Sequence, residues 1–274
     1  MSIRKKIIFI SLSILIVTLA GCSFSTSDIK DKLEIVIFKI GKADSILLRI
    51  GQQTVLIDTG EDEDGEEIVD YMKKKELMTI DYLIVTHFDK DHVGGANTIL
   101  NELNVLNVIT PNYESSSKEY QAYLEALADH QIAPIKLTKA LSFTIGTATF
   151  TINPPRKSSY NSDNDYSLVT SVAHGKNTFL FAGDAEEERL SELINEGNLH
   201  HTFLKVPHHG RYNDQSKAFF TLVQPQYAVI TSSDKNPEDK KVVAALNQLD
   251  TEVYVTRDGD IVISSDGENL SINQ

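Results

Sequence analysis

The sequence predicts an α+β domain built as a four-layer αββα sandwich, in which two sheets pack together and helices cover their outer faces. Three observations predict it. The first expected elements are all strands, the rest consists of strand-rich halves with interspersed helices, and no proline-rich linker, low-complexity break or internal repeat divides residues 32–274. We therefore expect one domain over this range.

The first half begins with apolar runs rich in Val, Ile and Leu, which predict strands. The strands expected here are 33–38, 45–50, 53–57, 81–85 and 105–110. Helical patterns separate the later strands, and in the earliest of them Ile68, Tyr71 and Met72 share one side. The helices expected here are 66–77, 97–103 and 117–128.

The second half repeats the alternation with more strands and fewer helices, and so completes the sandwich. Its expected strands are 141–145, 148–152, 167–174, 177–182, 203–206, 227–230, 252–255 and 261–264. Its expected helices are 185–195 and 240–249.

Residues 1–21 read as a secretory signal. Arg4, Lys5 and Lys6 precede a stretch of apolar and hydroxyl residues, 7–20, which is too short for a comfortable membrane span. The stretch ends in Leu-Ala-Gly-Cys, which resembles the bacterial lipobox and implies cleavage before a lipidated Cys22. The alternative is an uncleaved signal anchor.

Cys22 is the only cysteine in the chain, so the exported domain has no disulfide and its one thiol lies where lipidation would consume it. Residues 22–31 would then be the lipidated cysteine and a polar tether, with the domain over residues 32–274. We expect the protein on the extracytoplasmic face of a bacterial cell membrane, with the lipid bilayer as its partner.

The composition is acidic. The net charge is −13, and removal of residues 1–21 takes away three positive charges and no negative ones, which leaves −16. Because nucleic-acid affinity usually rests on many Lys and Arg contacts to phosphate, this charge does not favour a long nucleic-acid footprint. An anionic substrate would need metal ions or a local basic patch. The acidic run 61–67 is interpreted as a solvated loop and helix start.

The segment 86–95, Thr-His-Phe-Asp-Lys-Asp-His-Val-Gly-Gly, is typical of a metal-binding loop. It places two imidazoles and two carboxylates within six residues, directly after the expected strand 81–85. A strand end holds the backbone while the loop lets side chains converge, and His with Asp suits Zn, Mn or Fe. The glycine pair is expected to allow a tight turn into the next helix.

Seven segments together resemble those of metallo-β-lactamase-fold hydrolases, and among them the ComEC-like branch. They are 41–47 (Gly-Lys-Ala-Asp-Ser-Ile-Leu), 56–60, 87–92, 164–169, 181–184, 204–210 and 255–261. The resemblance covers nearly the whole mature chain, and it implies the same αββα fold.

The resemblance also implies a binuclear metal site. His87 and Asp89 would hold the first ion, Asp91 and His92 the second, and Asp184 would bridge both. In the broader superfamily a histidine stands where this chain has Asp89, and a carboxylate there shifts preference from Zn²⁺ toward Mn²⁺ without excluding Zn²⁺.

The rest of the ligand set is open. A histidine of the Pro-His-His-Gly segment would complete the second site, and we prefer His208 over the adjacent His209. The family usually supplies a histidine as third ligand of the first ion, where this chain offers residues 163–165, with Asn164 in the middle. Asp58 is interpreted as a residue that holds the metal loop by hydrogen bonds.

Two such ions would activate a bridging hydroxide for in-line displacement, with Asp91 or Asp184 as catalytic residues that orient it. Lys205, His209 or Arg211 is expected near developing charge on the phosphoryl oxygens. The other histidines, which lack a partner motif, are assigned to surface or structural roles. They are His130, His174, His200 and His201.

The resemblance suggests cleavage of a phosphodiester, either DNA or a wall or headgroup compound. Two alternatives stay open. One is hydrolysis of a lactone, thioester or other ester on the same fold, and the other is a binding lipoprotein without catalytic activity.

Overall fold

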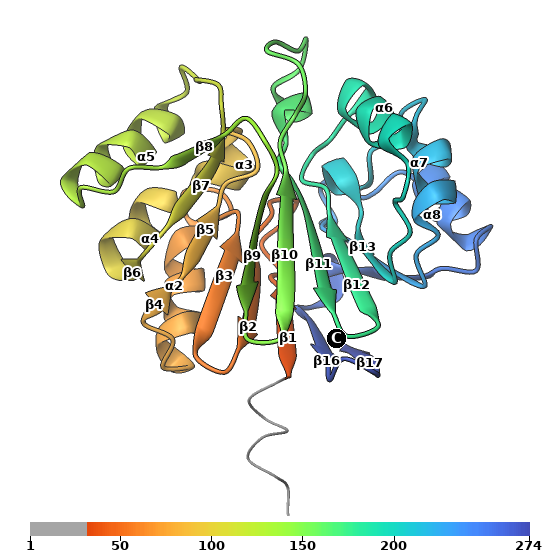
Figure 1. Cartoon of the computed structure of the whole chain (residues 1–274), viewed down its shortest axis with the longest axis horizontal. Coiled ribbons are helices and arrows are strands. Elements are labelled where there is room, and N and C mark those ends of the chain that lie inside the picture. The colour runs from red at the N-terminus through yellow and green to blue at the C-terminus, as the bar shows by residue number, and fades with distance from the viewer. Residues whose placement is uncertain (1–31) are drawn as a thin grey trace, which may run out of the picture.

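Two sheets face each other at the centre of the structure, and helices cover their outer faces (Figure 1). The computed structural model describes residues 32–274. The αββα sandwich expected from the sequence is confirmed. The expected signal peptide of residues 1–21 and the expected lipidation of Cys22 lie outside the described residues.

The first sheet has eight strands, and the four at one end of it are parallel. In spatial order the strands are β17 (Leu270–Asn273), β16 (Ile261–Ser265), β1 (Leu33–Ile37), β2 (Ile46–Ile50), β3 (Gln53–Ile57), β5 (Tyr82–Ile84), β7 (Val108–Pro111) and β8 (Ile135–Leu137). β3, β5, β7 and β8 run parallel to one another. Their carboxyl ends therefore lie at one edge of the sheet.

The second sheet has seven strands and follows the same plan. In spatial order they are β15 (Glu252–Val255), β14 (Tyr227–Ile230), β13 (Phe203–Lys205), β12 (Asn177–Phe181), β11 (Val169–His174), β10 (Ala148–Asn153) and β9 (Leu141–Ile145). β12 to β15 are parallel. In such sheets, ligands bind beyond the carboxyl ends of the strands, so this edge is where a site is expected.

Helices flank each sheet. The first sheet is covered by α2 (Asp64–Lys74), α4 (Ala96–Glu102) and α5 (Lys118–Asp129), and the second by α6 (Glu187–Glu196), α7 (Ser216–Val223) and α8 (Lys240–Asn247). The shorter pieces are α3 (Lys90–Val93), the 3₁₀ turns η1 (Asp163–Tyr166), η2 (Pro207–Gly210) and η3 (Thr256–Asp258), and the paired β4 (Thr79–Ile80) and β6 (Asn104–Val105).

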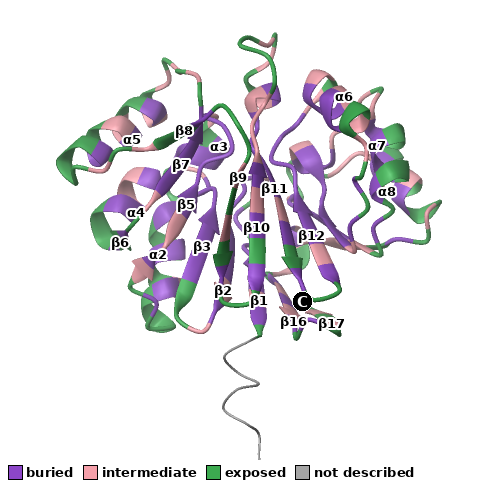
Figure 2. Ribbon diagram, viewed as in Figure 1, coloured by how far each residue is buried: buried purple, intermediate pink, exposed green. Residues whose placement is uncertain are grey.

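Buried apolar residues form three clusters, one for each interface between the four layers. Ile35 and Ile37 of β1 belong to the cluster between the two sheets, whereas Val36 packs under the helices of the first sheet. Successive side chains of a strand point to opposite faces, so a run of apolar residues is needed where both faces are covered. Figure 2 shows buried residues along β3, β5 and β7 and exposed ones on the outer sides of helices.

The differences from the expected elements concern short or edge segments. The structure adds β8, β17 and α7, which were not predicted, and it divides the expected strand 105–110 into β6 and β7 around the exposed Leu106. Two of the three residues of β8 are exposed, so its sequence lacks the alternation of apolar and polar residues from which a strand is predicted. None of the helices within residues 32–274 has the length and apolar character needed to span a membrane.

Gly94 and Gly95 have a different purpose from the one expected. Both have ordinary negative φ, −57° and −78°, so no left-handed turn requires glycine here. A Cβ at Gly95 would lie 2.4 Å from the Thr59 carbonyl oxygen and 2.9 Å from Gly65 Cα. The missing side chain therefore lets the metal loop pack directly on the turn after β3 and on the start of α2.

We predict that Gly95→Ala lowers the free energy of unfolding by about 1–3 kcal/mol, because backbone must shift to admit the methyl group. Urea denaturation measures this. Gly259→Ala is the matched control, since the nearest atom to its new Cβ would be 3.6 Å away. Equal stability of the two variants would contradict the close-packing explanation.

Candidate metal centre

The candidate site lies where strands of both sheets end. The loop after β5 carries His87, Asp89, Asp91 and His92, the latter two on α3, and Asp184 follows β12. His209 lies in η2, directly after β13. The parallel course of β3, β5, β12 and β13 brings these distant segments to one edge.

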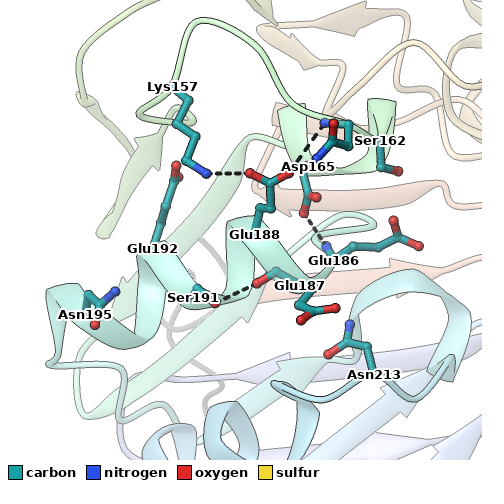
Figure 3. A pocket seen from close by; sticks show the side chains of 11 residues that line it. Lys157, Ser162, Asp165, Glu186, Glu187, Glu188, Ser191, Glu192, Asn195 and Asn213 are labelled. Atoms are coloured by element: carbon teal, nitrogen blue, oxygen red, sulfur yellow. Dashed lines mark hydrogen bonds and ion pairs between the residues drawn. The ribbon is translucent and has the colours of Figure 1, made fainter.

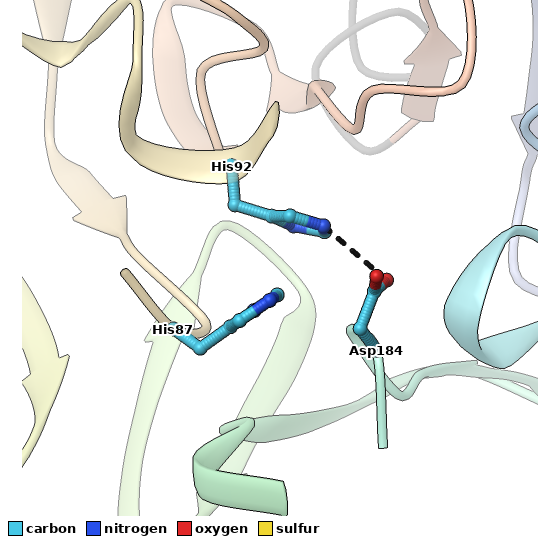
Figure 4. A group of neighbouring side chains, drawn as sticks. All are labelled: His87, His92 and Asp184. Carbon is cyan, nitrogen blue, oxygen red and sulfur yellow. Dashed lines mark ion pairs between the residues drawn. The ribbon is translucent and has the colours of Figure 1, made fainter. Parts of the chain in front are cut away.

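His87, His92 and Asp184 each offer a ligand atom within 4.8 Å of the others, and all three are buried (Figure 4). A second such group consists of Asp91, His92 and His209. Asp184 lies between two imidazoles, with Oδ1 3.3 Å from His92 Nε2 and Oδ2 3.0 Å from His209 Nε2. The two groups share His92 and so form one cluster.

Four buried atoms of this cluster make no hydrogen bond within residues 32–274, although the histidines among them lie at ion-pair distance from Asp89 or Asp184. They are Nε2 of His87, Nε2 of His92, Nε2 of His209 and Oδ1 of Asp184. A buried polar atom without a partner costs about 1–3 kcal/mol, and such atoms are rare in folded proteins. Their grouping at one point is what a divalent metal centre requires, so the residues present fit metal ions.

The electrostatics of the cluster also favour a cation. Burial lowers the pKa of His92, but the charges of Asp184 and Asp58 outweigh it and raise that pKa well above its ordinary value. Burial raises the pKa of Asp184, but His209 and His92 outweigh it and hold that pKa well below the usual range. The carboxylates thus stay ionised and attract positive charge to this point.

Asp58 orients the two histidines of the metal loop. Its Oδ2 lies 2.8 Å from His92 Nδ1 and accepts a hydrogen bond from the Thr86 hydroxyl at 2.7 Å. Because the Thr86 hydroxyl donates its one hydrogen to Asp58, it can only accept a hydrogen bond from His87 Nδ1, which is 3.1 Å away. In their neutral form both imidazoles then carry the proton on Nδ1, which leaves Nε2 as the atom that can bind a metal.

His209 is held in the same way by a second carboxylate. Its Nδ1 lies 3.0 Å from the Thr231 hydroxyl, which donates to Asp44 Oδ1 at 2.7 Å. Lys205, fully buried, pairs with the other oxygen of Asp44. Burial raises the pKa of Asp44, but Lys205 and His209 outweigh it and lower that pKa.

The structure favours His209 over His208, which corrects the preference drawn from the sequence. Both residues have left-handed backbone, with φ of 46° and 50°, so their side chains leave the turn in different directions. His209 points into the cluster, whereas His208 is 26% exposed and its Nδ1 lies 2.9 Å from Glu186. Non-glycine residues rarely adopt this conformation, and where they do a functional constraint is common.

Asp89 lies at the margin of the cluster, and Asn164 lies near Glu186. The Asp89 carboxylate is 41% exposed and 3.7 Å from His87 Nε2. Asn164 lies in η1, with a buried Oδ1 that lacks a partner among the described residues. His208 lowers the pKa of Glu186 to about 2 against the effect of burial, and Ser162 and Asn164 contribute further hydrogen bonds.

Of the three groups expected near the phosphoryl oxygens, His209 lies in the cluster, whereas Lys205 and Arg211 have other partners. Lys205 is enclosed with Asp44, and Arg211 donates to the Pro237 carbonyl at 3.1 Å and lies 3.5 Å from Asp239. Among the histidines without a motif, His201 is buried against the Ser171 hydroxyl and the Leu199 carbonyl oxygen, a structural role.

An open cavity of about 500 Å³ adjoins the cluster. Its lining includes Asp89 and Asp91 of the metal loop, Lys42 from the loop after β1, the serines 115–117 and Asp163 of η1. The volume suits a small ligand or one unit of a polymer.

A larger cavity of about 710 Å³ runs along α6 and is rich in acidic side chains (Figure 3). It contains none of the four unpartnered cluster atoms. Its carboxylates have structural partners, since Asp165 accepts from the Glu186 and Arg189 amides at the start of α6 and Glu188 pairs with Lys157. We therefore place the candidate site at the smaller cavity.

Residues 40–232 match the metallo-β-lactamase superfamily. The chain belongs to this superfamily of metallo-hydrolases, and its buried His and Asp residues are candidate metal ligands. The solved structure of the metallo-β-lactamase fold protein YhfI from Bacillus subtilis resembles it with a TM-score of 0.58 at 12% identity, covering 85% of this chain and 100% of that one. That likeness concerns the fold.

Two relatives fit the ComEC-like resemblance. ComE operon protein 3 of Bacillus subtilis is 28% identical over 222 residues, which cover 74% of this chain and 29% of that protein. Recombination protein 2 of Haemophilus influenzae is 29% identical over 220 residues, 77% of this chain and 24% of that protein. The present chain thus spans less than a third of the length of either.

The sequence did not assign Asp44, Lys42, Thr86 or Thr231 to the site. Asp44 and Lys42 belong to the family-like segment 41–47, and Thr86 is the first residue of the metal loop. The sequence therefore marked these segments without indicating the role of the three residues. Thr231 immediately follows β14 and has no motif of its own.

We predict that His209→Ala reduces the metal ions retained per chain, whereas His208→Ala retains the wild-type number. The reason is that, of these two histidines, only His209 has its Nε2 buried among the other candidate ligand atoms. Elemental analysis after dialysis against Mn²⁺ or Zn²⁺ measures this. Loss of metal from the His208 variant alone would reverse the assignment.

Proposed function

We propose that this protein is a binuclear metal-dependent phosphodiesterase. The observation that carries the proposal is the convergence of four buried atoms without a hydrogen bond, from three histidines and Asp184, beside an open cavity. The residues that would hold the metal ions are His87, Asp89, Asp91, His92, Asp184 and His209. Mn²⁺ and Zn²⁺ both suit this mixture of imidazole and carboxylate.

Divalent ions held here would supply an activated water and charge stabilisation for an in-line displacement at phosphorus. The chain's own residues have three tasks. Asp58 holds His92 directly and His87 through Thr86, and Asp44 holds His209 through Thr231. Asp91 and Asp184 offer carboxylate oxygens that can accept a hydrogen bond from the attacking water and orient it. The buried strand ends exclude bulk water from one side.

The phosphodiester class is supported by the relatives named for the ComE operon and for recombination, which favour nucleic acid. Wall polymers and lipid headgroups carry the same phosphodiester chemistry. The acidic charge of the chain favours short substrates over a long nucleic-acid footprint.

The test is hydrolysis of bis-p-nitrophenyl phosphate by the metal-loaded protein, followed by DNA and wall polymer. We expect Asp184→Asn to lower kcat by about a hundredfold or more, because removing a charge at the ions forfeits several kcal/mol of stabilisation. Asp129→Asn, exposed at the end of α5, is the matched control.

Other outcomes separate the alternatives. Turnover of p-nitrophenyl acetate or a lactone without turnover of the phosphodiester would favour ester hydrolysis. Metal binding without turnover of either substrate would favour a binding lipoprotein, and absence of metal binding would defeat the proposal.

We further propose that the protein is anchored on the extracytoplasmic face of a bacterial membrane by a lipid on Cys22. β1 begins at the lower edge in Figure 1, whereas α3 of the metal loop lies toward the upper edge. A tether that precedes β1 would leave the site facing away from the membrane. Cys22→Ser is expected to move the protein from the membrane fraction to the soluble fraction, and unchanged fractionation would contradict the anchor.

A further inference from the structure

Lys42 stands at the boundary between the ligand cluster and the open cavity. It lies in the loop between β1 and β2, lines the cavity of about 500 Å³, and its side chain is 35% exposed. Its ammonium pairs with Asp91 Oδ2, the same oxygen that lies 3.5 Å from His209 Nε2. A positive charge is therefore held beside the candidate metal ligands, at the side from which a substrate enters.

We propose that Lys42 binds the negatively charged oxygen of the substrate and so selects anionic phosphoryl esters over neutral esters. This inference rests on the proposed metal-dependent hydrolase. It names Lys42 as the side chain that recognises the negative charge of the substrate.

The position of Lys42 is fixed by neighbouring backbone. The Asp44 amide donates to the Asp91 carbonyl at 3.0 Å, so the loop after β1 is tied to the metal loop two residues from Lys42. An ammonium has three donors. Within residues 32–274 Asp91 is the only side chain or carbonyl that Lys42 Nζ hydrogen-bonds, which leaves donors available to a ligand.

The other basic side chains near the site are engaged elsewhere. Lys90 also lines the cavity, but it is 59% exposed and its Nζ lies 3.2 Å from Glu61. Lys205 is enclosed with Asp44. Lys42 is thus the cation in this lining that is directed to the cluster itself.

The rest of the lining makes such a cation necessary. Asp89, Glu119 and Asp163 contribute carboxylates to the same cavity, and an anionic ligand would be repelled by them. The Lys42 ammonium beside the candidate metal ligands would offset that repulsion for a phosphoryl group bound in this cavity. The serines 115–117 add hydroxyl donors suited to an oxygen-rich anion.

The experiment measures the binding of inorganic phosphate to the Mn²⁺-loaded protein by calorimetry, together with the Mn²⁺ content of each variant. Lys42→Gln is expected to weaken phosphate binding by about tenfold or more, as for loss of one charge-assisted hydrogen bond, with Mn²⁺ content unchanged. Lys42→Arg should retain most of the affinity. Lys90→Gln, which lines the same cavity but pairs with Glu61, is the matched control and should bind phosphate as the wild type does.

Three results would overturn the inference: no phosphate binding by the wild type, equal phosphate affinity in Lys42→Gln, or loss of Mn²⁺ from Lys42→Gln. The last would mean that Lys42 acts by positioning Asp91. Hydrolysis is scored separately. If phosphate binding depends on Lys42 but no phosphodiester is cleaved, the proposed activity fails while the role of Lys42 stands.

Discussion

The site depends on two buried carboxylates, Asp58 and Asp44, each of which needs hydrogen-bond donors in the interior. Asp58 receives the amide and hydroxyl of Thr86, and Asp44 receives the hydroxyl of Thr231 and the ammonium of Lys205. Because an unpaired buried charge costs several kcal/mol, these donors must come together whenever the chain folds. The same contacts aim the histidines, so stability and orientation of the site have one cause.

The two sheets contribute complementary halves of the centre. The first supplies Asp58 and the metal loop, and the second supplies Asp184 and His209. The Asp44–Lys205 pair joins a loop of the first sheet to a strand end of the second. The candidate ligand set is therefore complete only when the sheets have packed, and the isoleucine-rich interface between them positions these residues as well as stabilising the fold.

Charge is distributed so that the acidic chain can still receive an anion. Lys205 forms a buried ion pair with Asp44, whereas Lys42 is held at the open cavity by its ion pair with Asp91. Burial gives the two lysines different roles: Lys205 positions Asp44, and Lys42 can contact a ligand in the cavity. Membership of the metallo-β-lactamase superfamily sets the general chemistry, and these local pairs give this chain its own character.

The sequence by itself determined the sandwich, most of its strands, and the loop 87–92, because apolar periodicity and closely spaced ligands are local patterns. It left open which of His208 and His209 enters the cluster, since two left-handed residues in η2 decide that and no side-chain pattern encodes them. Asp44 meets Lys205 across 161 positions and Thr231 across 187. Only tertiary packing decides such pairings, because residues so far apart in the chain form no local sequence pattern. They pair because each buried charged or polar group needs a partner.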